Sequence, residues 1–235
     1  MIRLMDTLWR RVNLNLQLTP YRVLATSPDT GMMEFVQGST AVERIKSNIL
    51  AYFRSSSPDD AAPHGVSPTV MDTYVKSCAG YCVITYLLGV GDRHYDNLML
   101  QPSGHFFHVD FGFIFGADPK PMPPPMKITK QMIEGMGGVD SANYMAFRGF
   151  ASQAYNIIRK HATLVMNLLH LMRDAGLENM GPNPEATLAA LQAKFRLEAD
   201  DETAERAFLK LIDESVAALA PQFSDYIHTI ATRLR

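Results

Sequence analysis

The spacing of apolar residues predicts helices over most of the chain. Residues 2–12 carry apolar side chains at intervals of three or four, which is the period of one helix face. Residues 67–88 are apolar almost all round, begin with a Ser-Pro pair that suits a helix start, and stop at Gly89. A helix without a polar face is buried on all sides, so we expect this segment at the centre of the fold.

Further helices are predicted on both sides of that segment. A short one is indicated before it by Ile45, Ile49, Tyr52 and Phe53. The others follow it, over residues 141–159, 161–175, 183–195, about 201–219 and 221–235. In the helix that starts near residue 201, the side chains expected to face inward are Ala204, Phe208, Leu211 and Leu219.

Two β-hairpins are predicted as well. Residues 21–26 and 32–37 have strand patterns on either side of a Ser-Pro-Asp-Thr-Gly turn. Residues 98–100 and 106–109 have strand patterns on either side of Gln-Pro-Ser-Gly. Helices combined with short antiparallel hairpins indicate an α+β fold that is mostly helical.

Composition limits the class of protein. The 235 residues suffice for one large domain, and 47% hydrophobic with 20% charged residues is a globular composition. A net charge of −2 offers no positive field for nucleic acid. The longest uncharged apolar run, residues 82–91, is too short to cross a bilayer, and the N-terminus has no signal-peptide pattern. We therefore expect a cytoplasmic protein without a transmembrane segment, whose membrane contact is peripheral.

The two cysteines, Cys78 and Cys82, lie four positions apart on a helical pattern. Their spacing differs from Cys-x-x-Cys and there is no second pair, which speaks against a metal site. Cysteines one helical turn apart do not easily form a disulfide. We expect two small apolar residues on a buried helix face.

The second hairpin carries the most specific chemistry. Asp92-Arg93-His94 and then Asn97 precede its first strand, and Asp110-Phe111-Gly112 follows its second. A hairpin brings its two ends to one edge, so Asn97 and Asp110 offer two hard oxygen ligands for Mg²⁺ or Mn²⁺. Phosphoryl transfer needs such ligands and a group that acts on the attacking hydroxyl. Asp92 and His94 are both candidates for accepting its proton, and the sequence leaves open which of them does so.

Common protein kinases have His-Arg-Asp in the catalytic loop, whereas this chain has the reversed order Asp-Arg-His. With Asn97 and Asp-Phe-Gly, this order resembles the phosphatidylinositol 3-/4-kinase superfamily. Residues 71–82, the proline-rich residues 118–127 and residues 134–138 are similar to class III phosphatidylinositol 3-kinases. The resemblance implies that residues 1–235 form the large, C-terminal lobe of a kinase-like catalytic domain. It places a hinge at 34–37, a catalytic loop at 89–97 and an activation loop at 110–134.

The resemblance also assigns roles to single residues. Asp110 would be the principal metal ligand and Asn97 the second, while His94 would lie near the inositol hydroxyl and the γ-phosphate of ATP. The adenine contacts would be Phe35, Val36, Met99 and Val109, for which plain core packing is the alternative. In the activation loop Lys120 and Lys127 would bind substrate, with Lys127 nearest the lipid phosphate. A docking site for polyproline-reading domains is a further alternative for this loop.

The last predicted helix, residues 221–235, is amphipathic. Its apolar face consists of Phe223, Tyr226, Ile227, Ile230 and Leu234, and two arginines lie at its end. This pattern suits shallow insertion at an anionic membrane surface. Packing of the same face against the lobe is an equally good interpretation.

The function implied by the resemblance is ATP-dependent phosphorylation of the 3-hydroxyl of phosphatidylinositol. The product, phosphatidylinositol 3-phosphate, would serve endosomal trafficking and autophagy on the corresponding membranes. The implied partners are a protein-kinase-like regulatory subunit and a beclin-type scaffold. Two alternatives remain: a related Ser/Thr protein kinase, and a non-catalytic fragment that binds a membrane or a partner.

The small upper lobe of a kinase is expected to be missing from these residues. No glycine occurs before Gly31 and no lysine before Lys46, so neither a glycine-rich phosphate loop nor a phosphate-pairing lysine precedes the hinge. We expect residues 1–235 alone to bind ATP weakly and to turn over negligibly. Apolar groups such as Trp9 are expected to be exposed on the open upper face.

Overall fold

The computed structural model describes residues 1–46, 48–173 and 175–219. Among them are the α-helices α1 (Ile2–Arg11), α2 (Ile49–Ser56), α3 (Pro68–Leu88), α4 (Lys130–Gly135), α5 (Ala142–Arg159), α6 (Ala162–Leu171), α7 (Pro184–Ala193) and α8 (Asp201–Ala217). Single turns of 3₁₀-helix are formed by Val42–Ile45, Pro63–Gly65, Tyr95–Asn97 and Glu178–Met180. The predicted amphipathic helix with Phe223, Tyr226, Ile227, Ile230 and Leu234 lies outside the described residues.

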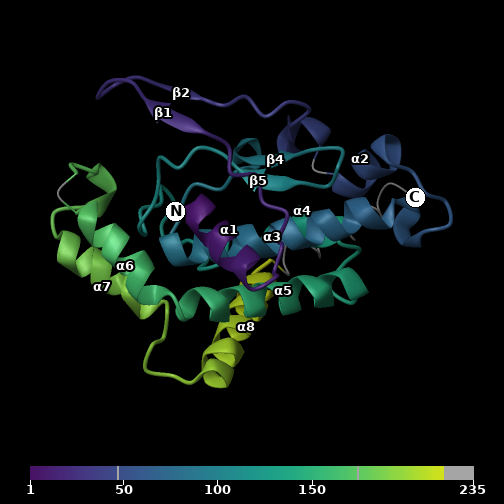
Figure 1. Ribbon diagram of the computed structural model, residues 1–235. Helices are drawn as coiled ribbons and strands as arrows, with labels where there is room; N and C mark the ends of the chain where they lie inside the picture. Colours follow the sequence, from purple (N-terminus) through teal and green to yellow (C-terminus); the bar gives the residue numbers. More distant parts are fainter. Residues whose placement is uncertain (47, 174, 220–235) are drawn as a thin grey trace.

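Helix α3 runs through the middle of the molecule, as predicted (Figure 1). The hairpin β4–β5 lies on one side of it and α5 on the other. Cys78 and Cys82 are buried and unpaired, as expected from their helical spacing. The helix ends where Gly89 takes a left-handed conformation with a φ of 58°, which glycine adopts without a steric penalty.

Two small antiparallel sheets are present in the described part of the chain. Strands β1 (Val23–Ala25) and β2 (Gly31–Met33) pair with Leu24 opposite Met32, and all their residues are exposed. Strand β4 (Leu98–Leu100) lies between β3 (Thr40–Ala41) and β5 (Phe106–His108). The hairpins confirm the predicted α+β class, although the first has shorter strands than the sequence suggested and β3 was not predicted.

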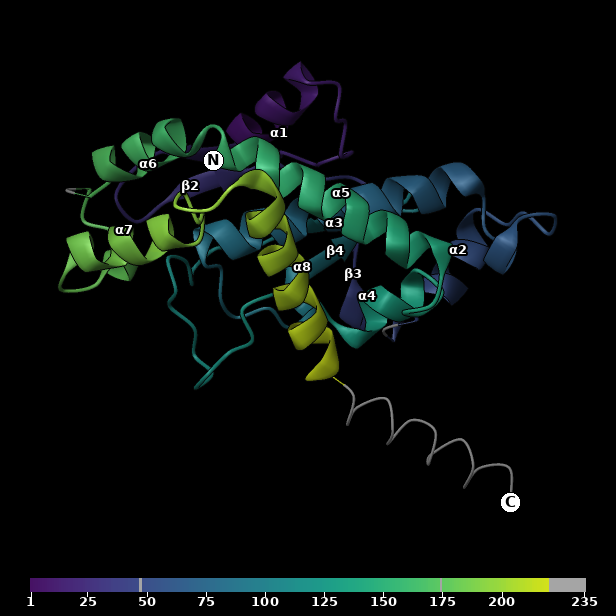
Figure 2. The same ribbon diagram turned by 90° about the horizontal axis from the view of Figure 1, so that it is seen from below.

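Helices α6, α7 and α8 follow α5 in the chain. Helix α8 lies against α5, and α6 and α7 lie side by side (Figure 2). Within α8, Phe208 stacks on Tyr155 of α5 with ring centroids 4.3 Å apart. Ala204 and Phe208 are buried, as predicted, whereas Leu211 and Leu219 are only partly buried and Ile212, which was not predicted to face inward, is fully buried.

Helix α1 corrects one expectation. Trp9 is fully buried, and its Nε1 donates a hydrogen bond of 2.9 Å to the carbonyl oxygen of Ala154 in α5. The indole therefore belongs to the core of the lobe and not to an open upper face. The apolar stripe of α1 had the right period, but the sequence did not show which element that stripe covers.

Helix α4 was not predicted. It is six residues long, which is too short for an apolar period to show. The Thr129 side chain caps it by accepting the Met132 amide at 3.2 Å, and the Tyr74 hydroxyl donates to the Met132 carbonyl oxygen at 3.1 Å. A side chain of α3 thus fixes the end of the predicted activation loop.

Candidate active site

The predicted catalytic loop, residues 89–97, leaves the end of α3 and runs beside residues 113–118. The Phe115 amide donates to the Leu88 carbonyl and the Gly116 amide to the Gly89 carbonyl, both at 2.8 Å. The Gly91 amide donates back to the Phe113 carbonyl at 2.9 Å. A Cβ atom on Gly91 would stand 2.1 Å from the Ala117 carbonyl oxygen, so only glycine permits this approach.

Arg93 joins the catalytic loop to the Asp-Phe-Gly segment. Its guanidinium donates to the carbonyl oxygens of Gly91 and Val109, each at 2.7 Å, and to that of Asp110. It also lies over the Phe111 ring, 5.6 Å from the centroid. Burial lowers the pKa of Arg93, while the Asp110 carboxylate opposes that shift. The sequence identified Arg93 only as part of a motif, because its bonding depends on the tertiary approach of the two segments.

The two predicted metal ligands lie at the same end of the β4–β5 hairpin. Asn97 is buried; its Nδ2 donates to the Asp92 carbonyl at 2.9 Å, so Oδ1 is the atom that can face a metal ion. Its backbone carbonyl accepts the Val109 amide at 3.1 Å. Asp110 is exposed, and its Oδ1 accepts the Gly112 amide at 3.1 Å.

This donor set fits Mg²⁺. The ion prefers oxygen ligands and commonly takes only one or two from the protein, the rest being water and substrate phosphates. Among the described residues no group of three or more His, Cys, Asp and Glu side chains could hold a metal by itself. The arrangement therefore suits an ion shared with a nucleotide better than a closed structural metal site.

His94 lies between two carboxylates at the open side of the loop. Its Nε2 is 3.8 Å from Asp92 Oδ2 and its Nδ1 is 3.7 Å from Asp96 Oδ2. These distances exceed normal hydrogen bonds but bring both candidate bases to one place. The imidazole side chain is 47% exposed and that of Asp92 25%. Either group can receive a proton from a hydroxyl, and the alternative left open by the sequence stays open.

The predicted adenine contacts separate into two pairs. Phe35 and Val36 line a cavity of about 600 Å³, together with Leu18, Thr19, Pro20, Tyr21, Glu34, Gln37, Gln101 and His105. Phe35 is 82% exposed. Met99 and Val109 are half-buried on the β4–β5 hairpin and do not line this cavity.

Tyr21 is a site residue that the sequence did not single out. It lines the cavity that includes Phe35 and also a second, apolar cavity of about 430 Å³ that includes Phe111. Its hydroxyl donates to the His108 carbonyl oxygen at 3.3 Å, and burial raises its pKa. No local pattern distinguishes this tyrosine from an ordinary strand residue.

The two predicted substrate lysines have different environments. Lys120 is exposed on the proline-rich loop. Lys127 is 10% exposed, and its Nζ lies 2.9 Å from Oδ2 of Asp118, whose side chain is 5% exposed. Burial acts to raise the pKa of Asp118, but the hydrogen bonds from Lys120 and Lys127 outweigh it and hold the pKa below its usual value.

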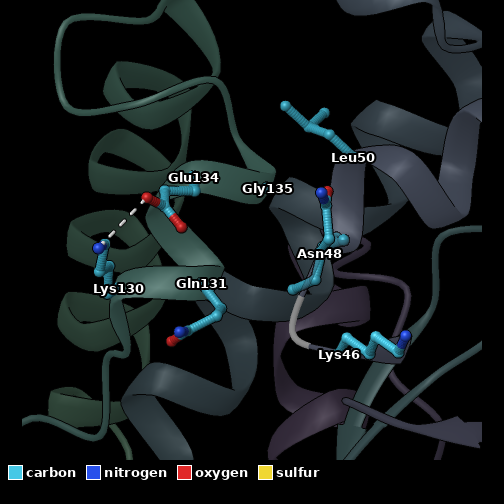
Figure 3. A pocket seen from close by; sticks show the side chains of 8 residues that line it. Lys46, Asn48, Leu50, Lys130, Gln131, Glu134 and Gly135 are labelled. Carbon is cyan, nitrogen blue, oxygen red and sulfur yellow. Dashed lines mark ion pairs between the residues drawn. The ribbon is translucent and has the colours of Figure 1, made fainter. Parts of the chain in front are cut away.

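A polar cavity of about 270 Å³ lies between the start of α2 and helix α4 (Figure 3). In Figure 3 Lys130 and Glu134 stand on the α4 side, with Nζ and Oε1 3.8 Å apart, and Asn48 stands on the α2 side. The Tyr95 hydroxyl hydrogen-bonds Gln131 Oε1, which connects this cavity to the catalytic loop. The cavity is therefore a neighbour of the candidate site and does not include Asn97 or Asp110.

Comparison with known proteins gives the family. The model of the phosphatidylinositol 3- and 4-kinase family matches residues 1–48 and 41–180. The chain belongs to this family, as the Asp-Arg-His and Asp-Phe-Gly motifs predicted. None of the helices in the described residues is long and apolar enough to cross a membrane.

The similar curated proteins are phosphatidylinositol 3-kinases. The root isoform of Glycine max is 49% identical over 97% of this chain, and phosphatidylinositol 3-kinase VPS34 of Arabidopsis thaliana is 49% identical over the same share. VPS34 of Saccharomyces cerevisiae is 45% identical over 98% of this chain. The chain spans 28% of the length of the two plant proteins and 26% of the yeast protein.

Proposed function

We propose that this chain carries the phosphoryl-transfer site of a phosphatidylinositol 3-kinase, which transfers the ATP γ-phosphate to the 3-hydroxyl of phosphatidylinositol. One observation carries the proposal. Arg93 ties the catalytic loop to the Asp-Phe-Gly segment, so that Asn97, Asp110 and the pair Asp92–His94 meet at one edge of a hairpin. The names of the relatives agree with this chemistry.

The residues divide the work as follows. Asp110 and the Oδ1 atom of Asn97 would hold Mg²⁺ or Mn²⁺, and the ion would neutralise charge on the ATP phosphates. His94 or Asp92 would accept the proton of the lipid hydroxyl. Phe35 and Val36 would contact adenine at the hinge, and Met99 and Val109 would approach it from the hairpin.

The basic residues of the activation loop favour an inositol lipid without extra phosphates. Between Asp110 and Glu134 these residues are Lys120, Lys127 and Lys130. Lys127 is paired with Asp118, and Lys130 is buried. A ring that already carries phosphates would need several free Arg or Lys side chains for neutralisation. Phosphatidylinositol itself, with a single phosphodiester, therefore suits this loop best.

The cellular setting follows from the same proposal. A kinase with this product would act from the cytoplasm on endosomal and autophagic membranes, with the face formed by Phe223, Tyr226, Ile227, Ile230 and Leu234 as a candidate membrane contact. A protein-kinase-like regulatory subunit and a beclin-type scaffold are the proposed partners. The second candidate activity is phosphorylation of Ser or Thr in proteins, which the same metal ligands would support.

The proposal is tested in the complete natural gene product. We expect Mg·ATP-dependent phosphorylation of phosphatidylinositol vesicles, little with a bis-phosphorylated inositol lipid, and none with Ser/Thr peptides. Asp110→Asn removes the charge of the main metal ligand and should lower turnover by more than ~100-fold without changing the thermal midpoint. Near-normal turnover of this variant at saturating Mg²⁺ would refute the metal assignment, and peptide phosphorylation without lipid phosphorylation would favour the second candidate.

A further inference from the structure

Asp118 gathers three hydrogen bonds from three different parts of the site. Its Oδ2 accepts the Lys127 ammonium at 2.9 Å and the backbone amide of Asp92 at 3.3 Å. Its Oδ1 accepts the backbone amide of Lys120 at 3.0 Å. The carboxylate is thus almost fully enclosed, and these bonds come from the catalytic loop and from a single proline-rich loop.

That loop, residues 118–127, is stiff and closed at its base. Five of its ten residues are prolines, which fix φ and favour an extended path. The ion pair between Asp118 and Lys127 joins its first residue to its last, and Met126 beside the base is fully buried. Met122 in the middle is 95% exposed. A stiff loop that is held at both ends moves as one body. Its orientation therefore depends on the segment to which its base, the Asp118–Lys127 pair, is attached.

The base is attached to the catalytic loop. The Asp92 amide donates to the Asp118 carboxylate, and Gly91 packs so closely on Ala117 that a single added methyl group would clash. Asp92 itself has a φ of 48°, a left-handed conformation that a non-glycine residue keeps only when its surroundings favour it. The hydrogen bond that the Asp92 amide donates to the buried Asp118 carboxylate supplies such support.

We propose that Asp118 is a positioning residue for phosphoryl transfer, which clasps the substrate loop to the catalytic loop at Asp92. The proposal rests on the lipid-kinase function above and refines it. Lys127 then anchors the loop through Asp118, and Lys120 is the loop cation that faces the lipid head group. The clasp fixes the distance between the bound lipid hydroxyl and the Asp92–His94 pair.

A different role for Lys127 makes a different prediction. If Lys127 contacted the lipid phosphate directly, its loss would weaken lipid binding independently of Asp118. If the two residues form a clasp, removal of either partner breaks the same interaction. Double-variant analysis separates these cases because coupled residues are not additive, whereas independent ones are.

The experiment compares Asp118→Asn, Lys127→Met and the double variant in the complete natural gene product. Turnover of phosphatidylinositol vesicles, the KM for ATP, and hydrogen exchange of residues 88–93 are measured.

We expect each single variant to lower kcat by ~10- to 100-fold, because a displaced loop misaligns the reacting groups. The double variant should fall no more than ~3-fold below the worse single one, since both substitutions break one clasp. The KM for ATP should stay unchanged, and residues 88–93 should exchange faster. Lys127→Arg should restore most of the turnover.

Asp213→Asn is the matched control. It removes a carboxylate from the ion pair with Arg148 that joins α5 to α8, outside the candidate site, and should leave turnover unchanged. Two results would overturn the clasp. The first is a loss of kcat in the double variant that equals the product of the losses in the two single variants. The second is turnover of Asp118→Asn within ~2-fold of the parent, with unchanged hydrogen exchange of residues 88–93. If the parent protein phosphorylates no lipid, the proposed function fails, while the exchange measurement still tests the clasp.

Discussion

Asp92 and Asp110 both hold left-handed backbone conformations, with φ values of 48° and 56°. Aspartate tolerates this region better than most residues, but it still needs local support. Arg93 supplies part of it, because its guanidinium donates a hydrogen bond to the Asp110 carbonyl oxygen. Asp110 is exposed at the end of the hairpin, so its carboxylate is accessible to a metal ion. Motif residues therefore act here through their backbone as much as through their side chains.

Lys194 is a half-buried cation at the end of α3. Its Nζ donates to the Tyr86 carbonyl at the end of α3 at 2.9 Å and lies over the Tyr86 ring. Burial lowers the pKa of Lys194 from 10.5 to about 8, and the positive charge of Lys127 acts in the same direction. The folded protein thus holds this proton less tightly than the unfolded chain does.

This shift predicts a pH dependence of stability. Between about pH 8 and 10.5 the unfolded chain binds more protons at Lys194, so this group raises the free energy of unfolding as pH increases, by at most ~1.4 kcal/mol per pH unit. Below about pH 8 the lysine is protonated in both states and contributes no slope. The measurement is urea unfolding of the parent and Lys194→Met from pH 7 to 10.5. The difference between the two profiles should change only above about pH 8; parallel profiles throughout would contradict the shifted pKa.

At the scale of elements, the site depends on contacts between segments far apart in sequence. Helix α1 is held on α5 by the buried indole of Trp9, and the catalytic loop is held on residues 113–118 by backbone bonds. Each contact joins two segments that the spacing of apolar residues predicts only one at a time. The lobe is assembled by these pairings, and α1 is the element whose docking a single side chain can test.

Two substitutions at Trp9 separate its hydrogen bond from its packing. Trp9→Phe keeps most of the buried ring but leaves the Ala154 carbonyl oxygen without this donor, at a cost of ~1 kcal/mol in unfolding free energy. Trp9→Ala also leaves a large cavity and should cost ~3–5 kcal/mol. Val12→Ala, at a half-exposed position just after α1, is the control and should cost little. Equal unfolding midpoints for Trp9→Ala and the control would show that α1 does not stabilise the lobe.

The sequence predicted those parts of the fold that have a local cause. The end of α3 at Gly89 needed only a glycine after an apolar run, and the hairpin with Asn97 and Asp110 needed only a turn between two apolar stretches. The strand β3 and helix α4 are too short to show a period, so they were missed. The contacts of Arg93 and Asp118 were missed because their partners come from other segments.

At the scale of the whole molecule, the β1–β2 hairpin stands out from the lobe (Figure 1). Its exposed apolar side chains are Val23 (68%), Leu24 (60%), Met32 (64%) and Met33 (61%), and Phe35 follows at 82%. A two-stranded sheet has two open edges and is only marginally stable in water. Apolar side chains gathered on such a hairpin favour association with another surface.

This surface predicts the solution behaviour of residues 1–235 expressed alone. We expect concentration-dependent self-association, because the hairpin offers both open edges and apolar side chains. Leu24 and Met32 are direct cross-strand partners, so the double variant Leu24→Lys, Met32→Glu places opposite charges across the same pair and should keep the hairpin while reducing association. Size-exclusion chromatography with light scattering should show a larger monomer fraction for this variant at equal concentration.

Leu171→Lys changes an even more exposed leucine (79%) at the end of α6 and is the control, which should associate like the parent. The hairpin is not the associating surface if the parent stays monomeric at every concentration. The same conclusion follows if the control variant reduces self-association as much as the hairpin variant does.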